Sequence, residues 1–368
     1  MDRRSIYQTA FASLRGINRV LAERLLACTG SEEGFFEASE SRLRALSGFQ
    51  SGIFKEDYRR GLVEKARAEV EFTDYAGIRR LYFTDDDYPQ RLAQCDDAPL
   101  MLFSMGDSPL NDGLFLGIVG TRHATPYGIA FVEKLIEQLG QRLAQPLTIV
   151  SGLAFGIDIA AHRAALRRGL NTVAVLAHGL NTIYPGAHRN DAARMAQGGG
   201  RLLTEYPSSA PVHKGNFLAR NRIVAGISDA VIVVESAEKG GALTTARIAA
   251  DYHRDVFALP GRTSDPYSRG CNRLIARNAA ALIQSADDLI DAMGWPCKPT
   301  SPEQGRLFPE MTPDEQRVVD LLTRQGEAGI NRLSVELDIN VGRLTALLID
   351  MEFKGLVIKF PGGKYRPA

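Results

Sequence analysis

The residues of this chain that could do chemistry gather in one stretch, residues 213–247, which reads HKGNFLARNRIVAGISDAVIVVESAEKGGALTTAR. Within it, Lys214 and Arg222 can neutralise phosphate groups, and Phe217 offers an aromatic face on which a base can stack. The apolar run over 230–236 is short and bounded by turn residues, which predicts a buried strand between two helices. The stretch therefore predicts one crossover of a parallel sheet, with an anion-binding site in its loops.

The rest of the middle region repeats this alternation of strands and helices. Strand-like runs occur at residues 114–120, 147–152, 171–179, 201–207, 230–236 and 255–261. Helical patterns fall between them, so we expect right-handed βαβ units and an α/β fold, an extended Rossmann-like, doubly wound parallel sheet. Basic residues, glycines and one serine lie at the carboxyl ends of several of these strands: Arg122, Ser151, Gly152, Lys239, Gly240 and Gly241. Because ligands bind at the carboxyl ends of such strands, we expect one crevice suited to an anionic backbone.

A nucleotide cofactor fits this crevice poorly. The dinucleotide fingerprint G-x-G-x-x-G should open the first helix, but the chain reads GIVGTRHATPYG there, with Arg122 and His123 in place of glycines. The P-loop lysine motif of ATP-hydrolysing enzymes is also missing. We therefore expect no cofactor.

Composition and charge indicate an ordinary globular protein of two or three domains. Hydrophobic residues make up 45% of the 368 residues, and the four cysteines are scattered, which predicts neither a disulfide framework nor a zinc site. No signal core or membrane-spanning run is apparent, so we expect a cytoplasmic protein with no membrane contact. Positive charge concentrates in the middle, where residues 106–309 hold 21 Lys and Arg against 17 Asp and Glu.

The two ends predict smaller domains around a Rossmann-like core at 73–295. Residues 1–72 show helical spacing with two glycine turns, at Gly16 and Gly48, and are weakly similar to SAM or helix-hairpin-helix modules. A purely structural helical domain remains the alternative, since the glycine pattern is short and residues 1–105 hold 15 Lys and Arg against 17 Asp and Glu. Residues 296–313 read as a Pro-rich linker.

Residues 314–368 predict a winged helix-turn-helix, with three helices and a hairpin that turns at Gly362 and Gly363. Its would-be recognition helix, residues 340–353, carries Arg343 against Asp350 and Glu352, which favours a protein contact or a structural role over duplex reading. Lys359, Lys364 and Arg366 of the wing look suited to a phosphate.

Several carboxylates leave an enzyme open as an alternative. Glu205 and Glu235 end two strands and could serve as general acids or bases of a nucleotide N-glycosidase, although such residues more often pair with an arginine such as Arg220 or Arg222. Asp158 and His162 share one helix face, but an acidic residue at a helix start and a lone histidine are more often structural.

The strongest motifs together resemble one known family. They are GTR at 120–122, SGLAFGID at 151–158, FLARNRIVAGISDAVIVVES at 217–236, KGGALTTA at 239–246 and FALPG at 257–261. In this order and spacing they look like the DNA-processing protein A family (DprA, also called Smf). The resemblance covers about residues 75 to 290.

The resemblance implies a non-enzymatic, cytosolic bacterial protein that binds single-stranded DNA cooperatively. Such proteins protect incoming DNA, help load the RecA recombinase during natural transformation, and commonly form homodimers through the Rossmann-like domain. Carried over by motif, the resemblance points to these DNA-binding residues: Arg122, Ser151, Gly152, Lys214, Phe217, Asn221 and Arg222. A duplex-binding regulator led by the winged helix remains a further alternative.

Overall fold

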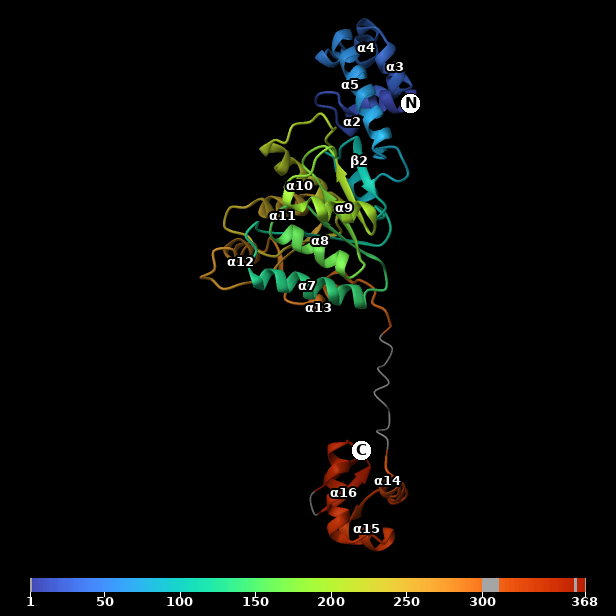
Figure 1. Ribbon diagram of the computed structural model, residues 1–368, viewed down its shortest axis with the longest axis vertical. Coiled ribbons are helices and arrows are strands. Elements are labelled where there is room, and N and C mark those ends of the chain that lie inside the picture. The colour runs from blue at the N-terminus through green and yellow to red at the C-terminus, as the bar shows by residue number, and fades with distance from the viewer. Residues whose placement is uncertain (1, 300–310, 361–362, 368) are drawn as a thin grey trace. The chain divides into compact units, whose positions relative to one another are not determined.

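The computed structural model describes residues 2–299, 311–360 and 363–367 and divides into two compact units, Met1–Lys298 and Pro299–Ala368. The first unit is built on a nine-stranded sheet of order β1-β2-β6-β5-β4-β3-β7-β8-β9 (Figure 1). Its strands are β1 (Arg79–Tyr82), β2 (Met101–Gly106), β3 (Leu114–Val119), β4 (Leu147–Ser151), β5 (Asn171–Val175), β6 (Gly200–Thr204), β7 (Ala230–Val233), β8 (Asp255–Ala258) and β9 (Ala281–Leu282). Strands β3 to β9 pair in parallel, which confirms an α/β fold with a mostly parallel central sheet.

Helices cover both faces of this sheet (Figure 1). One face packs against α7 (Pro126–Arg142), α8 (Ile157–Arg167), α9 (Arg189–Gln197) and α13 (Ala286–Met293). The other packs against α6 (Gln90–Ala93), α10 (Lys214–Ile227), α11 (Gly241–Asp251) and α12 (Arg269–Ala276). A short 3₁₀ turn, Gly186–His188, precedes α9.

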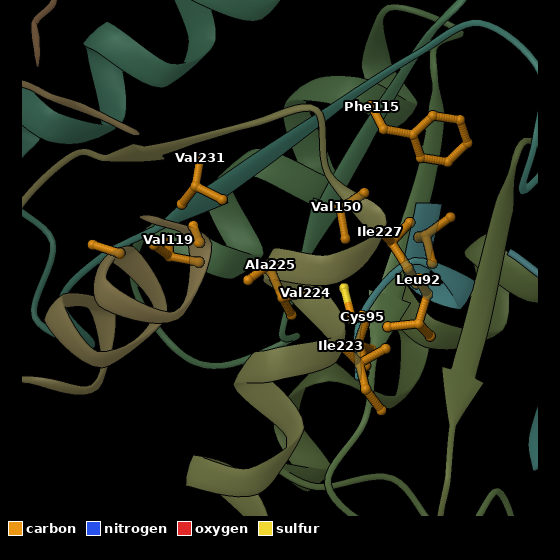
Figure 2. Close-up of a cluster of buried hydrophobic side chains, with 14 of the residues drawn as sticks. Leu92, Cys95, Phe115, Val119, Val150, Ile223, Val224, Ala225, Ile227 and Val231 are labelled. Carbon is orange, nitrogen blue, oxygen red and sulfur yellow. The ribbon is translucent and has the colours of Figure 1, made fainter. Parts of the chain in front are cut away.

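The alternation of side chains along each strand explains why both faces are apolar. In β7, Val231 and Val233 join the cluster beneath α10 and α11, whereas Ala230 and Ile232 join the cluster beneath α7 and α8. Figure 2 shows the first cluster, in which Val231 and other strand residues lie near the apolar side chains of α10. A strand buried on both faces needs a continuous apolar run, which is the pattern that the sequence shows over 230–236.

The predicted parallel sheet carries antiparallel strands at one edge. Strand β2 pairs antiparallel with β6, and β1 pairs antiparallel with β2. The sequence also predicts a strand at 80–83, which β1 confirms, but β2 was missed, because only the four-residue helix α6 separates these two strands and the alternation of a βα unit is lost. The antiparallel pair extends the sheet toward the N-terminal helices.

The N-terminal region is helical, as its spacing predicted. It comprises α1 (Arg3–Ala12), α2 (Arg19–Thr29), α3 (Glu32–Glu37), α4 (Glu40–Ser47), a 3₁₀ turn (Gly52–Phe54) and α5 (Glu56–Tyr75). Gly16 and Gly48 have φ of +74° and +73°, so both predicted glycine turns adopt the left-handed conformation. Buried Phe11 and Phe35 of these helices belong to the same cluster as Tyr82 and Phe103 of β1 and β2. The helical region thus shares a core with the edge of the sheet.

The second unit contains three helices and a small antiparallel sheet. Its elements are α14 (Pro313–Gln325), β10 (Ala328–Gly329), α15 (Ile330–Leu337), α16 (Val341–Phe353), β11 (Val357–Phe360) and β12 (Lys364–Pro367), and the strands lie in the order β10-β12-β11. Residues 300–310 of the predicted linker lie outside the described residues, as do Gly362 of the predicted hairpin turn and its neighbour Pro361. The backbone of Cys297 forms an isolated antiparallel β-bridge with that of Leu143. Residues 296 and 297 therefore belong to the first unit, and the linker expected from 296 begins later.

None of the helices within the described ranges is long and apolar enough to cross a membrane.

A charged hydrogen-bond cluster ties α6 to the middle of the sheet. Arg91 donates to both carboxylate oxygens of Asp229, at 2.6 and 3.0 Å, and to the carbonyl of Gly113 at 2.8 Å. The same carboxylate accepts the backbone N–H of Phe115 at 2.8 Å, and the guanidinium lies 4.4 Å from the Phe115 ring centroid. Both charged side chains are about four-fifths buried, so removing one leaves the other without a partner.

We predict that Asp229→Ala lowers the free energy of unfolding by about 3 kcal/mol, because the Arg91 charge and the Phe115 N–H lose their acceptor together. The matched control is Asp287→Ala, which removes an exposed ion pair with Arg142 and should leave stability nearly unchanged. Urea unfolding followed by circular dichroism measures both. Similar losses in the two variants would contradict the role given to Asp229.

Candidate functional site

A cleft of about 840 Å³ opens at the carboxyl ends of the central strands. Its walls come from the loops after β3, β4 and β7 and from the first turns of α10 and α11. The lining residues that could contact a ligand are Arg122, His123, Asp158, Tyr184, Lys214, Phe217, Arg220, Asn221, Ser236, Lys239, Gly240, Gly241 and Tyr267. The cleft therefore lies where parallel sheets of this kind usually bind their ligands.

Three exposed cations line the cleft. Arg122 follows β3, Lys214 begins α10 and Lys239 precedes α11. Within the described ranges none of the three forms an ion pair. Their charges are thus available to an anionic ligand, and three cations from three loops suit a ligand with several phosphates better than a single anion.

Aromatic rings flank these cations. The Phe217 ring lies 5.6 Å from that of Tyr184, measured between centroids, in an edge-to-face arrangement, and the Arg122 guanidinium lies 5.8 Å from the Phe217 centroid. On another wall His123 stacks on Tyr267 with centroids 6.0 Å apart. Tyr184 and His123 are exposed, and Phe217 and Tyr267 are partly buried. Accessible rings beside cations are the arrangement with which proteins bind the bases and the backbone of a single strand.

The start of α11 adds backbone donors. Gly240 occupies the N-cap position and provides no side-chain acceptor, so first-turn N–H groups are left without a cap. Asn221, in the middle of α10, donates to the carbonyl of Gly241 at 3.4 Å, which joins α10 to the start of α11. The positive end of the helix dipole and the nearby Lys239 both favour an anion at this place.

A buried arginine supports the floor of the cleft. Arg220 of α10 donates to the carbonyl of Val175 at the end of β5, at 2.7 Å. Burial lowers the pKa of Arg220 and raises that of buried Asp158 at the start of α8, and the opposite charge of each partner counteracts both shifts. A Cβ at Gly152 would lie 1.8 Å from the Arg220 guanidinium, so only glycine fits there.

Glu235 holds the loop that carries Arg122. Its carboxylate accepts the backbone N–H and the hydroxyl of Thr125, at 2.9 and 2.5 Å, and its carbonyl accepts the N–H of Thr121 at 2.7 Å. Gly128 leaves room for this carboxylate, because a Cβ there would lie 2.5 Å from it. Both carboxylate oxygens are occupied, so Glu235 positions the start of α7 and is not free to act as a general base.

The structure brings seven of the ten predicted DNA-binding residues into the cleft lining. They are Arg122, Lys214, Phe217, Asn221, Lys239, Gly240 and Gly241. Ser151 and Gly152 do not line it: the Ser151 hydroxyl is buried and donates to the Ile118 carbonyl at 2.6 Å, and Gly152 packs on Arg220. These two residues shape the floor from below.

Arg222 lies apart from the cleft. It forms an ion pair with Glu205 and donates to the Asp97 carbonyl at 2.6 Å, beside a second cavity of about 320 Å³. Burial raises the pKa of Glu205, although the positive charge of Arg222 acts in the opposite direction. Arg220 and Arg222 are two residues apart on one helix, so their side chains leave α10 in different directions.

Sequence reasoning missed the aromatic wall formed by His123 and Tyr267. Tyr267 follows β8, so its place after a sixth strand could have assigned it to the same edge of the sheet. His123 was considered only as an obstacle to a dinucleotide. The role of Arg220 beneath the cleft could not be read from spacing, because an arginine in a helix is usually exposed.

Comparison with known proteins gives one consistent family. The family model described as "DNA recombination-mediator protein A" matches residues 79–294. The chain is 35% identical to Protein Smf of Escherichia coli over 283 residues, which cover 76% of this chain and 75% of that protein. It is 40% identical to the DNA processing protein DprA of Streptococcus pneumoniae over 240 residues, which cover 65% of this chain and 80% of that one.

Two solved structures share the fold at the same level of identity. The crystal structure of DprA from Streptococcus pneumoniae matches with a TM-score of 0.63 and 31% identity, and the match covers 79% of this chain and 98% of the Streptococcus pneumoniae chain. DprA from Helicobacter pylori, solved in a study of its single-stranded DNA binding mode, covers 59% of this chain and 95% of its own, with a TM-score of 0.52 and 31% identity.

A buried histidine behind the cleft gives a test of the packing of α8. The Thr172 hydroxyl donates to the Ile149 carbonyl at 2.9 Å, so the Nδ1 of His162, 2.7 Å away, must be the donor to that hydroxyl. The Nε2 then carries no proton, and it has no partner among the described residues. Burial lowers the pKa of His162 to about 3.

We predict that stability falls on acidification through His162. The unfolded chain takes up this proton below pH ~6.5 and the folded chain only near pH 3, so the contribution is complete above the unfolded pKa and is lost as pH falls. Between pH 7 and 5 the wild type should lose about 2 kcal/mol more than His162→Gln. Chemical denaturation at several pH values measures this difference. The exposed His123→Gln control should keep the wild-type slope, and an unchanged slope in His162→Gln would disprove the assignment.

Proposed function

The chain belongs to the DNA recombination-mediator protein A family, and on this premise we propose that it binds single-stranded DNA in the cleft at the carboxyl ends of its sheet. The observation that carries the proposal is the set of three exposed cations, Arg122, Lys214 and Lys239, which form no ion pair within the described residues and are flanked by accessible aromatic rings. The cations follow the phosphates, the rings stack on bases, and neither kind of contact selects a sequence. The study of the Helicobacter pylori relative supports this assignment, because it describes single-stranded DNA binding by that protein.

In this proposal the protein acts as a binding protein in DNA processing and natural transformation. It protects incoming single strands in the cytoplasm and helps load RecA onto them, and it works as a homodimer formed through the Rossmann-like domain. Family membership supports these finer roles. The open cleft supports the first of them, since a strand can enter it without threading.

A nucleotide-processing enzyme is less well supported. Such an enzyme would need a carboxylate free to take or give a proton in the cleft. Both carboxylate oxygens of Glu235 are engaged by Thr125, and Glu205 lies at the other cavity, paired with Arg222. Asp158, which does line the cleft, is buried against Arg220.

The second unit fits a winged helix by its order of elements, three helices with a hairpin after the third. We do not propose that this unit recognises double-stranded DNA. Lys364 and Arg366 both form ion pairs with Glu327, and these cations lower the pKa of that carboxylate to about 2. The N-terminal helices we assign to a SAM-like or helix-hairpin-helix-like module, on the strength of the turns at Gly16 and Gly48.

We predict that Lys214→Glu weakens binding of a labelled oligothymidine about tenfold or more, because a phosphate contact becomes a repulsion. The dependence of log affinity on log salt should become shallower by about 0.7 for the lost contact. Fluorescence anisotropy at several salt concentrations measures both quantities. The control, Lys134→Glu, makes the same charge change at an exposed position of α7 outside the cleft lining. Equal losses in the two variants would mean that net charge, and not the cleft, determines binding.

Phe217→Ala should weaken the same binding by about 1 to 3 kcal/mol, because one base loses its stacking surface. The salt dependence should stay that of the wild type, since the contact carries no charge. This combination separates a stacking residue from a residue that only supports α10. A folded variant with full affinity would remove Phe217 from the interface.

A further inference from the structure

Helix α16 of the second unit is apolar on two opposite faces. Its inner face, including Leu344, Leu348 and Met351, is buried in the core of that unit. Its outer face carries a second stripe, one helical turn apart at each step: Gly342, Ala346, Ile349 and Phe353. Phe353 is 89% exposed and Ile349 46%. An exposed aromatic ring in such a stripe is typical of a surface that another protein covers.

Charged residues border this stripe on one side. At 100° per residue, Arg343 and Asp350 both lie on the same flank, one near each end of the helix. Asp350 forms no ion pair within the described residues. Arg343 reaches Asp314 at 2.7 Å but its side chain remains 74% exposed, so it can also reach a partner.

The stripe is complementary to itself. If a second α16 lies antiparallel across it, with the two-fold axis between Ala346 and Ile349, then Gly342 meets the partner's Phe353 and Ala346 meets the partner's Ile349. Each large side chain thus faces a small one. The two-fold rotation also keeps the charged flanks together, so Arg343 meets the partner's Asp350, and the same pair forms twice.

From this match of size and charge, we propose that the outer face of α16 pairs with the same face of a second copy of this chain. The occupant is a second copy because its helix supplies a small residue for each large one and an opposite charge for each charge. Duplex DNA offers neither, and the outer face brings one arginine beside two carboxylates, Asp350 and Glu352, to any phosphate. The contact goes beyond the proposed DNA binding and does not depend on it.

The contact should be weak. One pair of helices buries less than the roughly 1,000 Å² at which stable interfaces begin, so the association depends on protein concentration. Sedimentation velocity of the full chain over a wide concentration range measures it. The dimer proposed above forms through another surface, the Rossmann-like domain, so α16 pairing is measured as the association of such dimers into larger assemblies, and the difference between variants isolates it.

We expect Phe353→Glu to lower the association constant at least about tenfold, since the substitution removes the largest apolar side chain of a small interface twice and places a charge on its apolar stripe. The control is Val335→Glu, which changes a residue of α15 that is 81% exposed and lies outside the stripe; it should associate as the wild type does. Identical mass curves for Phe353→Glu and the wild type would overturn the proposal. So would loss of duplex DNA binding in Phe353→Glu with no change in mass.

A charge exchange tests the antiparallel geometry itself. Arg343→Glu and Asp350→Lys each place like charges together twice, so each variant alone should associate several-fold more weakly. In an equimolar mixture the two variants can pair with each other. In that mixed pair each residue at position 343 meets an opposite charge at position 350 of the partner, so association should recover. A defect of folding would not be repaired by mixing. A mixture as weak as the separate variants would overturn the proposal.

Discussion

The shape of the cleft depends on one buried charge, the guanidinium of Arg220. Arg220 is buried under the cleft floor, where it donates to the end of β5 and faces Asp158 at the start of α8. A buried guanidinium is costly unless its partners are in place, so this residue holds α10 against the end of β5. The first turn of α10 carries Lys214 and Phe217, and its place over the sheet therefore follows from Arg220. Gly152 is part of the same arrangement, because it alone leaves room for the guanidinium.

Sequence patterns predicted the parts of the fold that repeat. The six strand-like runs from 114 to 261 each coincide with a strand, because strands that are buried on both faces are largely apolar. Strand β2 escaped prediction because it enters the sheet without a crossover helix. The carboxyl-end rule also placed Arg122, Lys214 and Gly240 at one edge, since it depends only on strand direction.

The finer arrangement of side chains could not be predicted in the same way. Arg220 and Arg222 look alike in the sequence RNR, yet one supports the cleft and the other pairs with Glu205 beside a different cavity. Helical spacing shows that the two diverge, but it does not say which faces the ligand. Ser151 ends β4 directly before a glycine-rich turn, which suggests phosphate contact, whereas its hydroxyl already donates to a carbonyl of β3. Such choices depend on neighbours that are distant in sequence.

The pairing of Lys364 and Arg366 with Glu327 has a consequence for any nucleic acid that approaches the second unit. The carboxylate already occupies the position that a phosphate oxygen would take between these two cations. An incoming phosphate would have to displace it, so one anion would be exchanged for another and the net gain in affinity would be small. The Glu327 carboxylate would therefore compete with any phosphate for these two cations.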